Sequence, residues 1–297
     1  MPRDVERELT LARQTRSLTG TSNALGRLSL NQATIPAWTL PEAAAACARA
    51  GLGWIAPWRD RVAEVGLGAS IRAIRDAGLG VSSLCRGGWF GAADGAGRRD
   101  RMDDNRRAVE EAAELGAACL ILVCGPAPDR SLRAARDYVA EAVARLAEHA
   151  ASHGVALAVE PLHPMYCADR SVIVTLAQAL AVATPAGPGE RVGVVVDAYH
   201  VWWDPELYER VSACKGRILG FHVSDWLVPT PDMLNGRGLP GEGVIELRRL
   251  RQAVDGAGYA GPIEVEIFNK ELWALPAAEA LSLVAARYLA HVADQEV

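Results

Sequence analysis

Four stretches in the second half of the chain decide the fold: VALAVEPLH (155–163), VGVVVDAYH (192–200), ILGFHVSD (218–225) and PIEVEIFN (262–269). Each contains a short run rich in Val, Ile or Leu near Gly or Pro, which predicts a strand buried on both faces. At the ends of these runs stand four ionisable side chains, Glu160, Asp197, His222 and Glu266. Because an isolated carboxylate is costly to desolvate, we expect the four to share one partner, a divalent cation.

The same alternation of strand and helix extends outward through the chain. Strands are predicted at residues 27–31, 53–57, 80–85, 118–124, 155–160, 192–197, 218–223 and 262–268. One helix is predicted after Pro41, one ends at Gly78, and the others span 101–116, 131–153, 171–183, 205–213, 244–257 and 276–292. Buried strands that alternate with amphipathic helices require a parallel sheet covered on its faces.

Eight such strand–helix units are the number that a (β/α)8 barrel requires, so we expect a single α/β TIM barrel. A doubly wound open sheet is the alternative. The barrel is favoured because the charged residues all stand at the carboxyl ends of several strands. In a barrel those ends converge on one mouth, whereas in an open sheet they would be spread along an edge.

Length and composition fit one soluble catalytic domain. We predict an N-terminal extension at residues 1–25 and the barrel at 26–297. The net charge of -5 argues against a nucleic-acid partner. The apolar runs are too short for a membrane span, and the N-terminus lacks the apolar stretch of a signal peptide. The six cysteines include no CxxC pair, so we expect reduced thiols and a cytoplasmic location.

The residue types at the four strand ends point to a particular kind of metal. Three carboxylates and one imidazole form an oxygen-rich site that suits one Mn or Mg ion, with Co or Zn as alternatives. For each residue alone, an ordinary polar group at a strand end would be the better interpretation. The occurrence of all four on consecutive strands favours a metal site.

Other polar residues near the predicted mouth are candidates for substrate binding. His200 follows the sixth strand, and we interpret it as a substrate contact because the ligand set is complete without it. It could also be a ligand or simply begin a helix. Arg237, in NGRGLPGEG, would pair with substrate oxygens or with Glu266, or else be a solvated loop residue. Arg86 and His163 are weaker candidates with the same two interpretations.

Five tryptophans also fall in loops that follow predicted strands: Trp58, Trp89, Trp202, Trp203 and Trp226. Loops at this end of the strands build the mouth of a barrel. Besides ordinary core packing, two functions fit these side chains. They would form an apolar wall for a sugar ring, with Trp58 as a substrate contact, or the subunit interface of a homo-oligomer.

The ordered motifs VEPLH, DAYH, HVSDW, LPGEGVIELRRL and GYAGPIEVEIFN resemble those of the sugar phosphate isomerase/epimerase superfamily. These xylose isomerase-like barrels include ketose 3-epimerases and inosose dehydratases. The resemblance implies that Glu160, Asp197, His222 and Glu266 bind the metal. It also implies that Glu160 and Glu266 move protons, and that His200 and Arg237 hold a sugar substrate. The segment EPLHPMYCADR (160–170) departs from the epimerases and leaves the substrate open.

The implied chemistry is proton abstraction next to a carbonyl of a sugar or polyol-like substrate. Epimerisation, aldose–ketose isomerisation and elimination by a lyase or dehydratase all begin with this step, and the sequence does not separate them. A DNA-repair endonuclease of the same barrel type would need histidines on the second and third strands. No histidine precedes His149, which disfavours that alternative. A non-catalytic sugar-binding barrel would not need both proton-transfer carboxylates.

Overall fold

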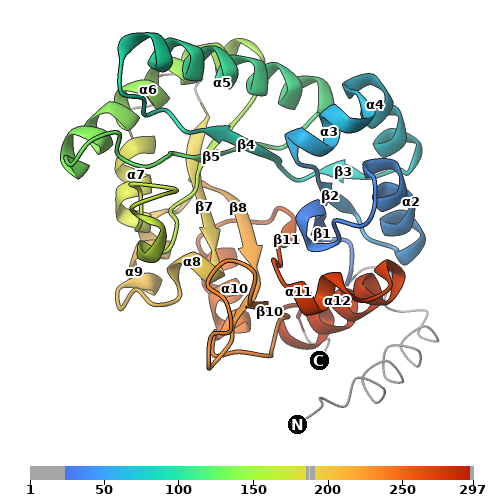
Figure 1. The fold of residues 1–297 in the computed structure, drawn as a ribbon. Helices are drawn as coiled ribbons and strands as arrows, with labels where there is room; N and C mark the ends of the chain where they lie inside the picture. Colours follow the sequence, from blue (N-terminus) through green and yellow to red (C-terminus); the bar gives the residue numbers. More distant parts are fainter. Residues whose placement is uncertain (1–23, 185–186, 188–190, 295–297) are drawn as a thin grey trace.

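The computed structural model describes residues 24–184, 187 and 191–294. Within them, nine parallel strand segments form a nearly closed barrel surrounded by helices, as expected (Figure 1). In sequence order the segments are β1 (Leu28–Asn31), β2 (Trp54–Ala56), β3 (Gly80–Val81), β4 (Leu84–Gly88), β5 (Leu120–Val123), β6 (Leu157–Val159), β7 (Val192–Asp197), β8 (Ile218–Val223) and β11 (Ile263–Val265). The predicted extension at 1–25 lies outside the described residues except for its last two.

The third barrel strand is divided into two segments, β3 and β4, separated by Ser82 and Ser83. The hydrogen-bonded order of strands is β3-β2-β1-β11-β8-β7-β6-β5-β4, so this divided strand stands at both ends of the series. The amide of Ser82 donates to the carbonyl of Ile55 at 3.0 Å, and that of Leu84 donates to the carbonyl of Cys119 at 3.0 Å. These bonds join the divided strand to its neighbouring strands on both sides and so close the sheet into a barrel.

The helices form the outer layer of the barrel (Figure 1). They are α2 (Leu40–Ala50), α3 (Arg59–Val65), α4 (Leu67–Asp76), α5 (Gly95–Leu115), α6 (Leu132–Ser152), α7 (Leu176–Ala183), α8 (Ala198–Val201), α9 (Leu207–Ala213), α10 (Leu247–Gly256), α11 (Lys270–Trp273) and α12 (Ala277–His291). Short 3-10 helices follow two strands, η2 (Gln32–Thr34) and η3 (Pro164–Tyr166). After β8, the segments β9 (Asp225–Trp226) and β10 (Arg237–Gly238) form a small antiparallel pair.

The starts of two helices differ from the sequence prediction by five or six residues, and side-chain caps explain both. The helix predicted at 101–116 begins six residues earlier, because Asp94 accepts a hydrogen bond from the amide of Gly97 at 2.7 Å. The helix predicted at 171–183 begins only at Leu176, where Thr175 accepts a bond from the amide of Gln178 at 3.2 Å. Such caps satisfy amides that the first helical turn leaves unpaired.

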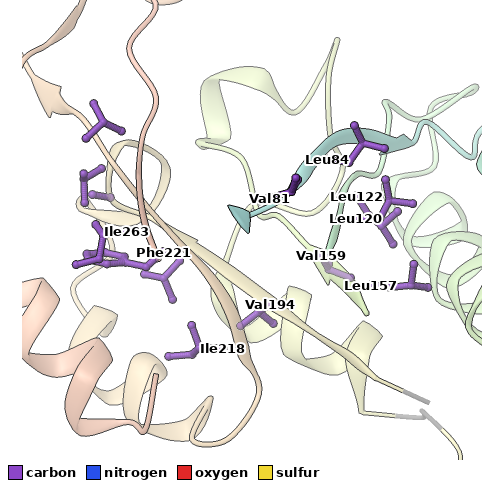
Figure 2. Packing of buried hydrophobic residues seen from close by; sticks show 14 of the residues in the cluster. Val81, Leu84, Leu120, Leu122, Leu157, Val159, Val194, Ile218, Phe221 and Ile263 are labelled. Carbon is purple, nitrogen blue, oxygen red and sulfur yellow. The ribbon is translucent and has the colours of Figure 1, made fainter. Parts of the chain in front are cut away.

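The strands alternate between two apolar layers, as the period of a strand requires. Leu120 and Leu122 belong to the large core cluster shared with the helices (Figure 2), whereas Ile121 belongs to a small cluster of residues in strands or directly before them. Ala158 and Val195 are also members of this inner cluster. Glu160 lies two residues after Ala158, and Asp197 lies two residues after Val195. Both carboxylates therefore face the same barrel interior. The sequence thus places both carboxylates inside the barrel, above a layer of small apolar side chains.

All six cysteines are free thiols, and five of them are buried. Burial raises the pKa of Cys47 to about 12 and that of Cys124 to about 12, so these thiols are held protonated. Among the described helices, none combines the length and the apolar character needed to cross a membrane.

Candidate active site

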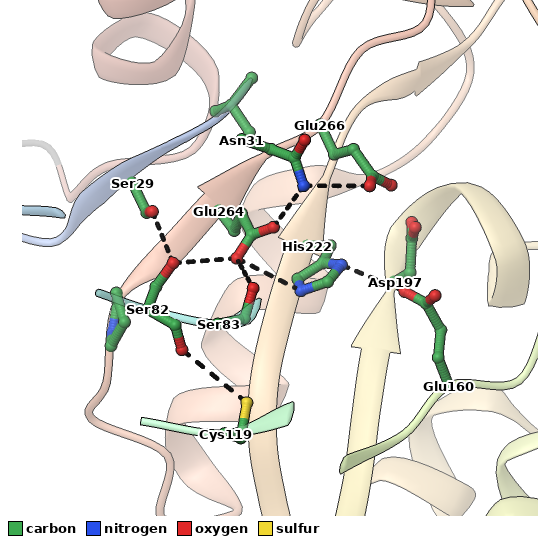
Figure 3. Close-up of polar contacts among 12 residues, drawn as sticks. Ser29, Asn31, Ser82, Ser83, Cys119, Glu160, Asp197, His222, Glu264 and Glu266 are labelled. Atoms are coloured by element: carbon green, nitrogen blue, oxygen red, sulfur yellow. Dashed lines mark hydrogen bonds and ion pairs between the residues drawn. The ribbon is translucent and has the colours of Figure 1, made fainter. Parts of the chain in front are cut away.

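Three of the four predicted ligands converge at the carboxyl ends of β6, β7 and β8 (Figure 3). Glu160, Asp197 and His222 offer ligand atoms that all lie within 4.8 Å of one another, and all three residues are buried. Parallel pairing of β7 with β8 sets Asp197 directly opposite His222. The convergence follows from strand register and does not depend on loop conformation.

The polar atoms of this group suit a bound cation. Glu160 Oε1 and Asp197 Oδ2 are buried, and neither makes a hydrogen bond of good geometry with the described residues. His222 Nδ1 faces the group and lies 3.1 Å from Glu160 Oε1. Buried polar atoms without partners are costly, and carboxylate oxygens with one imidazole nitrogen are a suitable donor set for a divalent ion. The residues present therefore fit the predicted metal.

Glu266 lies beside this group and is not one of its three close members. Its Oε2 accepts a hydrogen bond from Arg237 at 2.9 Å, and its Oε1 accepts one from Asn31 at 3.0 Å. On β11, Glu264 is the residue paired with His222, so Glu266 stands two residues nearer the barrel mouth. The structure holds this carboxylate above the other three side chains, between an arginine and an asparagine.

Glu264 is a buried carboxylate that the sequence analysis missed. Its Oε1 accepts from Asn31 at 2.7 Å, and its Oε2 accepts from Ser82 at 3.0 Å and from Ser83 at 2.9 Å (Figure 3). The same oxygen lies 3.6 Å from His222 Nε2. The imidazole therefore stands between Glu160 on one side and Glu264 on the other. The signal was present in PIEVEIFN, because residues two apart on a strand share a face.

The charges of the site do not balance among the described residues. Four buried carboxylates surround one arginine and two imidazoles, those of His200 and His222. Burial raises the pKa of Asp197 to about 6 and that of Glu266 to about 7, although the charge of Arg237 opposes both shifts. Burial also disfavours the charged form of His222, but the carboxylates of Glu264 and Glu160 outweigh it and raise its pKa to about 10. The excess negative charge favours a cation.

Arg237 and His200 form a second buried pair above the acidic group. The Arg237 guanidinium lies between the rings of Tyr199 and Phe268, with centroids at 4.6 Å and 4.9 Å. It approaches Asp197 Oδ2 at 3.5 Å and His200 Nε2 at 3.3 Å. Burial, together with the charge of Arg237, holds the pKa of His200 well below its usual range, so this imidazole is neutral. Arg237 is thus a buried cation, with only 4% of its surface exposed.

A cavity of about 370 Å³ opens above these groups. Its polar lining includes Arg86, Glu160, His200, Arg237 and Glu266. Its aromatic lining consists of Trp58, Trp89, Tyr166, Phe268 and Trp273. The Trp58 indole donates to Asn31 Oδ1 at 2.8 Å, which fixes its ring at the edge of the site. Most of the predicted substrate contacts therefore share one cavity, which is also lined by two of the predicted ligands, Glu160 and Glu266.

His163 lies elsewhere, outside the lining of this cavity. Its Nδ1 accepts a hydrogen bond from the amide of Met165 at 3.2 Å and so caps η3. Its ring packs against Trp226 at 5.0 Å and Trp203 at 5.8 Å between centroids. Trp202 packs on Trp226 as well, so these tryptophans belong to an aromatic cluster beside the site. Of the five loop tryptophans, Trp58 and Trp89 line the cavity.

A second group of possible ligands lies on the outer helices, where Glu110 of α5 faces His149 and His153 near the end of α6. Glu110 and His153 are exposed, and the two imidazole rings lie 4.4 Å apart. Exposed groups of this kind are solvated, so they do not need a cation as the buried group does.

Comparisons with known proteins agree with this geometry. The family model described as "Xylose isomerase-like TIM barrel" matches residues 44–289. A crystal structure of a protein from Sinorhizobium meliloti 1021 is similar at 48% identity and a TM-score of 0.87, covering 90% of this chain and 99% of that one. A crystal structure of the IolI protein with a zinc atom is similar in fold, at 20% identity and a TM-score of 0.78, with 90% and 98% of the two chains covered.

Among curated proteins, an inosose isomerase from Halalkalibacterium halodurans is 24% identical over 201 residues. The match covers 65% of this chain and 68% of that protein. The family model spans most of the barrel described above. The chain belongs to the xylose isomerase-like TIM barrel family.

Proposed function

We propose that the protein is a divalent-metal-dependent isomerase or epimerase that removes a proton from the carbon next to a carbonyl of a polyol-like substrate. The observation that carries this proposal is the pair Glu160 and Glu266. Both carboxylates line one cavity, and their strands are separated by β7 and β8. Two bases on different sides of one cavity suit a reaction in which a proton leaves one face and returns to the other.

The relatives support a sugar or cyclitol substrate. The curated match is named an inosose isomerase, and proteins of similar fold include one named D-psicose 3-epimerase and another named L-ribulose 3-epimerase. The cavity supports the same class, because its walls combine aromatic rings with charged groups. Aromatic faces pack on the apolar faces of a sugar ring, while charged groups hydrogen-bond its hydroxyls.

In the proposed mechanism, Glu160, Asp197 and His222 would hold the cation, with Glu266 as the fourth ligand. When bound, the cation supplies Lewis-acid polarisation of the carbonyl and offsets the negative charge that develops on its oxygen. Glu160 or Glu266 accepts the proton from carbon, and the opposite carboxylate returns one. Arg237 fixes the carboxylate of Glu266, and neutral His200 hydrogen-bonds a substrate hydroxyl. Trp58 and Phe268 exclude water from the reacting carbon.

Solvent exchange tests the proposal directly. The protein is incubated with Mn²⁺ in D2O with D-fructose, D-psicose or scyllo-inosose, and deuterium at carbon is followed by NMR. Enzyme-dependent exchange that a chelator abolishes and Mn²⁺ restores is the expected result. Loss of water from the substrate would identify elimination as the outcome of the same first step. Absence of exchange across neutral and anionic ketoses, with metal bound, would contradict the proposal.

A further inference from the structure

A second cavity, of about 440 Å³, adjoins the one above the acidic group. The two share a wall of four residues: Trp58, Cys85, Arg86 and Trp89. Beyond that wall the second cavity is lined by Arg59, Asp60, Gly87, Gly88, Arg101 and Asp104. Arg86 therefore borders both spaces, and a ligand that extends past it would enter a cavity with three arginines and two aspartates.

The arginines of the second cavity are not equally engaged. Arg59 forms ion pairs with Asp104 at 3.1 Å and Glu111 at 2.6 Å, so its charge is neutralised. The guanidinium groups of Arg86 and Arg101 form no ion pair or hydrogen bond within the described ranges. Asp60 is exposed to solvent. The half-buried Arg86 therefore adds positive charge to the boundary between the cavities, with Arg101 beyond it.

The segment that carries Arg86 is held in a fixed conformation. The Asn105 amide donates to the carbonyl oxygens of Gly88 at 2.7 Å and Arg101 at 2.8 Å, and its oxygen accepts from the amide of Gly88. One buried side chain thus ties the Arg86 segment to the helix turn that bears Arg101. A Cβ at Gly88 would lie 2.1 Å from the carbonyl oxygen of Val123, so only glycine fits this close approach.

Trp89 completes the arrangement in an uncommon conformation. Its φ of 55° lies in the left-handed region that non-glycine residues rarely adopt. In this conformation its ring lies 4.4 Å from the guanidinium carbon of Arg86. Stacking on an indole leaves the edge of a guanidinium open for hydrogen bonds in its own plane. Strained residues of this kind cluster at ligand sites.

We propose that this second cavity binds an oxyanion, a phosphate or carboxylate group on the substrate, through Arg86 and Arg101. This inference rests on the proposed function, because the same molecule would place its reacting carbon between Glu160 and Glu266. The substrate is then an anionic polyol derivative. Guanidinium groups suit such a ligand, since they bind phosphate and carboxylate through paired charge-assisted hydrogen bonds. A neutral sugar would leave the half-buried Arg86 without an anionic partner.

Anion binding is measured first, on metal-free protein, so that the anion cannot bind to a metal ion. Inorganic phosphate and glycolate are titrated calorimetrically into the wild type and into Arg86→Gln and Arg101→Gln. We expect binding of at least one anion to weaken about 10- to 100-fold in each variant. Arg99→Gln is the matched control, because Arg99 is exposed on α5, the helix that carries Arg101. This variant should bind the anions as the wild type does. Equal affinities in all proteins would overturn the proposal.

Substrate selectivity is measured second, with metal bound. Deuterium exchange is compared for D-fructose, D-fructose 6-phosphate and D-fructuronate, and the ratio of kcat/KM for anionic over neutral ketose is determined. The ratio should exceed one for phosphate or for carboxylate, which identifies the group, and should fall about 10- to 100-fold in Arg86→Gln. Arg86→Lys should restore part of it, since charge is kept and paired geometry is lost.

The two experiments separate the two proposals. Arginine-dependent phosphate or glycolate binding without exchange on any ketose would support the anion site and contradict the proton-transfer function. Exchange with the same selectivity in the wild type and Arg86→Gln would support the function and overturn the anion site. Circular dichroism confirms that each variant is folded. If Arg86→Gln is unstable, Arg101→Gln, at an exposed helix position, provides a second test of anion binding.

Discussion

Glu160 and Glu266 differ in their surroundings although both are assigned to proton transfer. Glu266 is bonded to Arg237 and Asn31, whereas Glu160 faces His222. We predict that Glu160→Gln and Glu266→Gln each lower the exchange rate by about 10²- to 10⁴-fold, because an amide cannot accept the proton. The rates are measured by NMR together with metal content. Variants that keep metal and full exchange would contradict the assignment.

Glu264 provides a second prediction at the residue scale, because its carboxylate faces His222 Nε2 at 3.6 Å. A carboxylate behind a metal-binding imidazole orients the ring and increases its basicity. We predict that Glu264→Gln weakens Mn²⁺ binding about 10- to 100-fold, measured by calorimetry. Glu279→Gln, on α12, is the control. Unchanged affinity in Glu264→Gln would show that this carboxylate only fills the barrel interior.

The charged residues at the ends of strands were predicted from the sequence, whereas Glu264, within a strand, and the uncharged Asn31 were missed. Glu160, Asp197 and His222 are conspicuous because each interrupts an apolar run. Glu264 lies within such a run. Asn31, which donates a hydrogen bond to Glu264, is uncharged and ends a strand that shows no unusual feature in the sequence. Their contacts depend on which strands become neighbours across the closed barrel, and a single sequence does not contain that information.

At the scale of elements, Asn105 joins α5 to the β4 segment by two hydrogen bonds to Gly88 and donates a third to Arg101 within its own helix. We predict that Asn105→Ala lowers the free energy of unfolding by about 2–4 kcal/mol, because it leaves buried groups of Gly88 without partners. Urea denaturation measures the change. Asp103→Ala, at an exposed position on the same helix, should change stability by less than about 1 kcal/mol. Equal effects would contradict the clamping role of Asn105.

The order of strands and helices could also be predicted, whereas several boundaries could not. The helix predicted to end at Gly78 is two helices, α3 and α4, because Gly66 adopts a φ of 88° between them. The third strand is divided at Ser82 and Ser83, whose side chains bond Glu264 in the barrel interior. Hydrophobic periodicity identifies elements, but such breaks are set by individual side-chain contacts.

At the scale of the whole molecule, the buried carboxylates link stability to pH and metal. The raised pKa values of Asp197, about 6, and Glu266, about 7, mean that the folded state holds protons that the unfolded chain has released. Their stabilising contribution is present below about pH 4 and is lost as pH rises through these values. We therefore predict that these groups make metal-free protein less stable at pH 8 than at pH 5.5.

Thermal unfolding measures this prediction with and without Mn²⁺. Binding requires deprotonated ligands, so the stabilisation by Mn²⁺ should increase from pH 5.5 to pH 8. Each kcal/mol corresponds to a shift of about 2–4 °C for a domain of this size. Asp197→Asn provides the comparison, since it removes one of the two titrating carboxylates. A metal effect that is constant or decreases with rising pH would contradict the charge balance described for the site.

The central claim is that four barrel strands each supply one ligand to a single divalent cation site. A crystal structure with Mn²⁺ tests it most directly. Anomalous scattering locates the ion. The account predicts one strong peak inside the barrel mouth, within about 2.0–2.6 Å of oxygen or nitrogen atoms of Glu160, Asp197, His222 and Glu266. A peak confined to Glu110, His149 and His153 at the surface, or no peak beside these four ordered side chains, would contradict it.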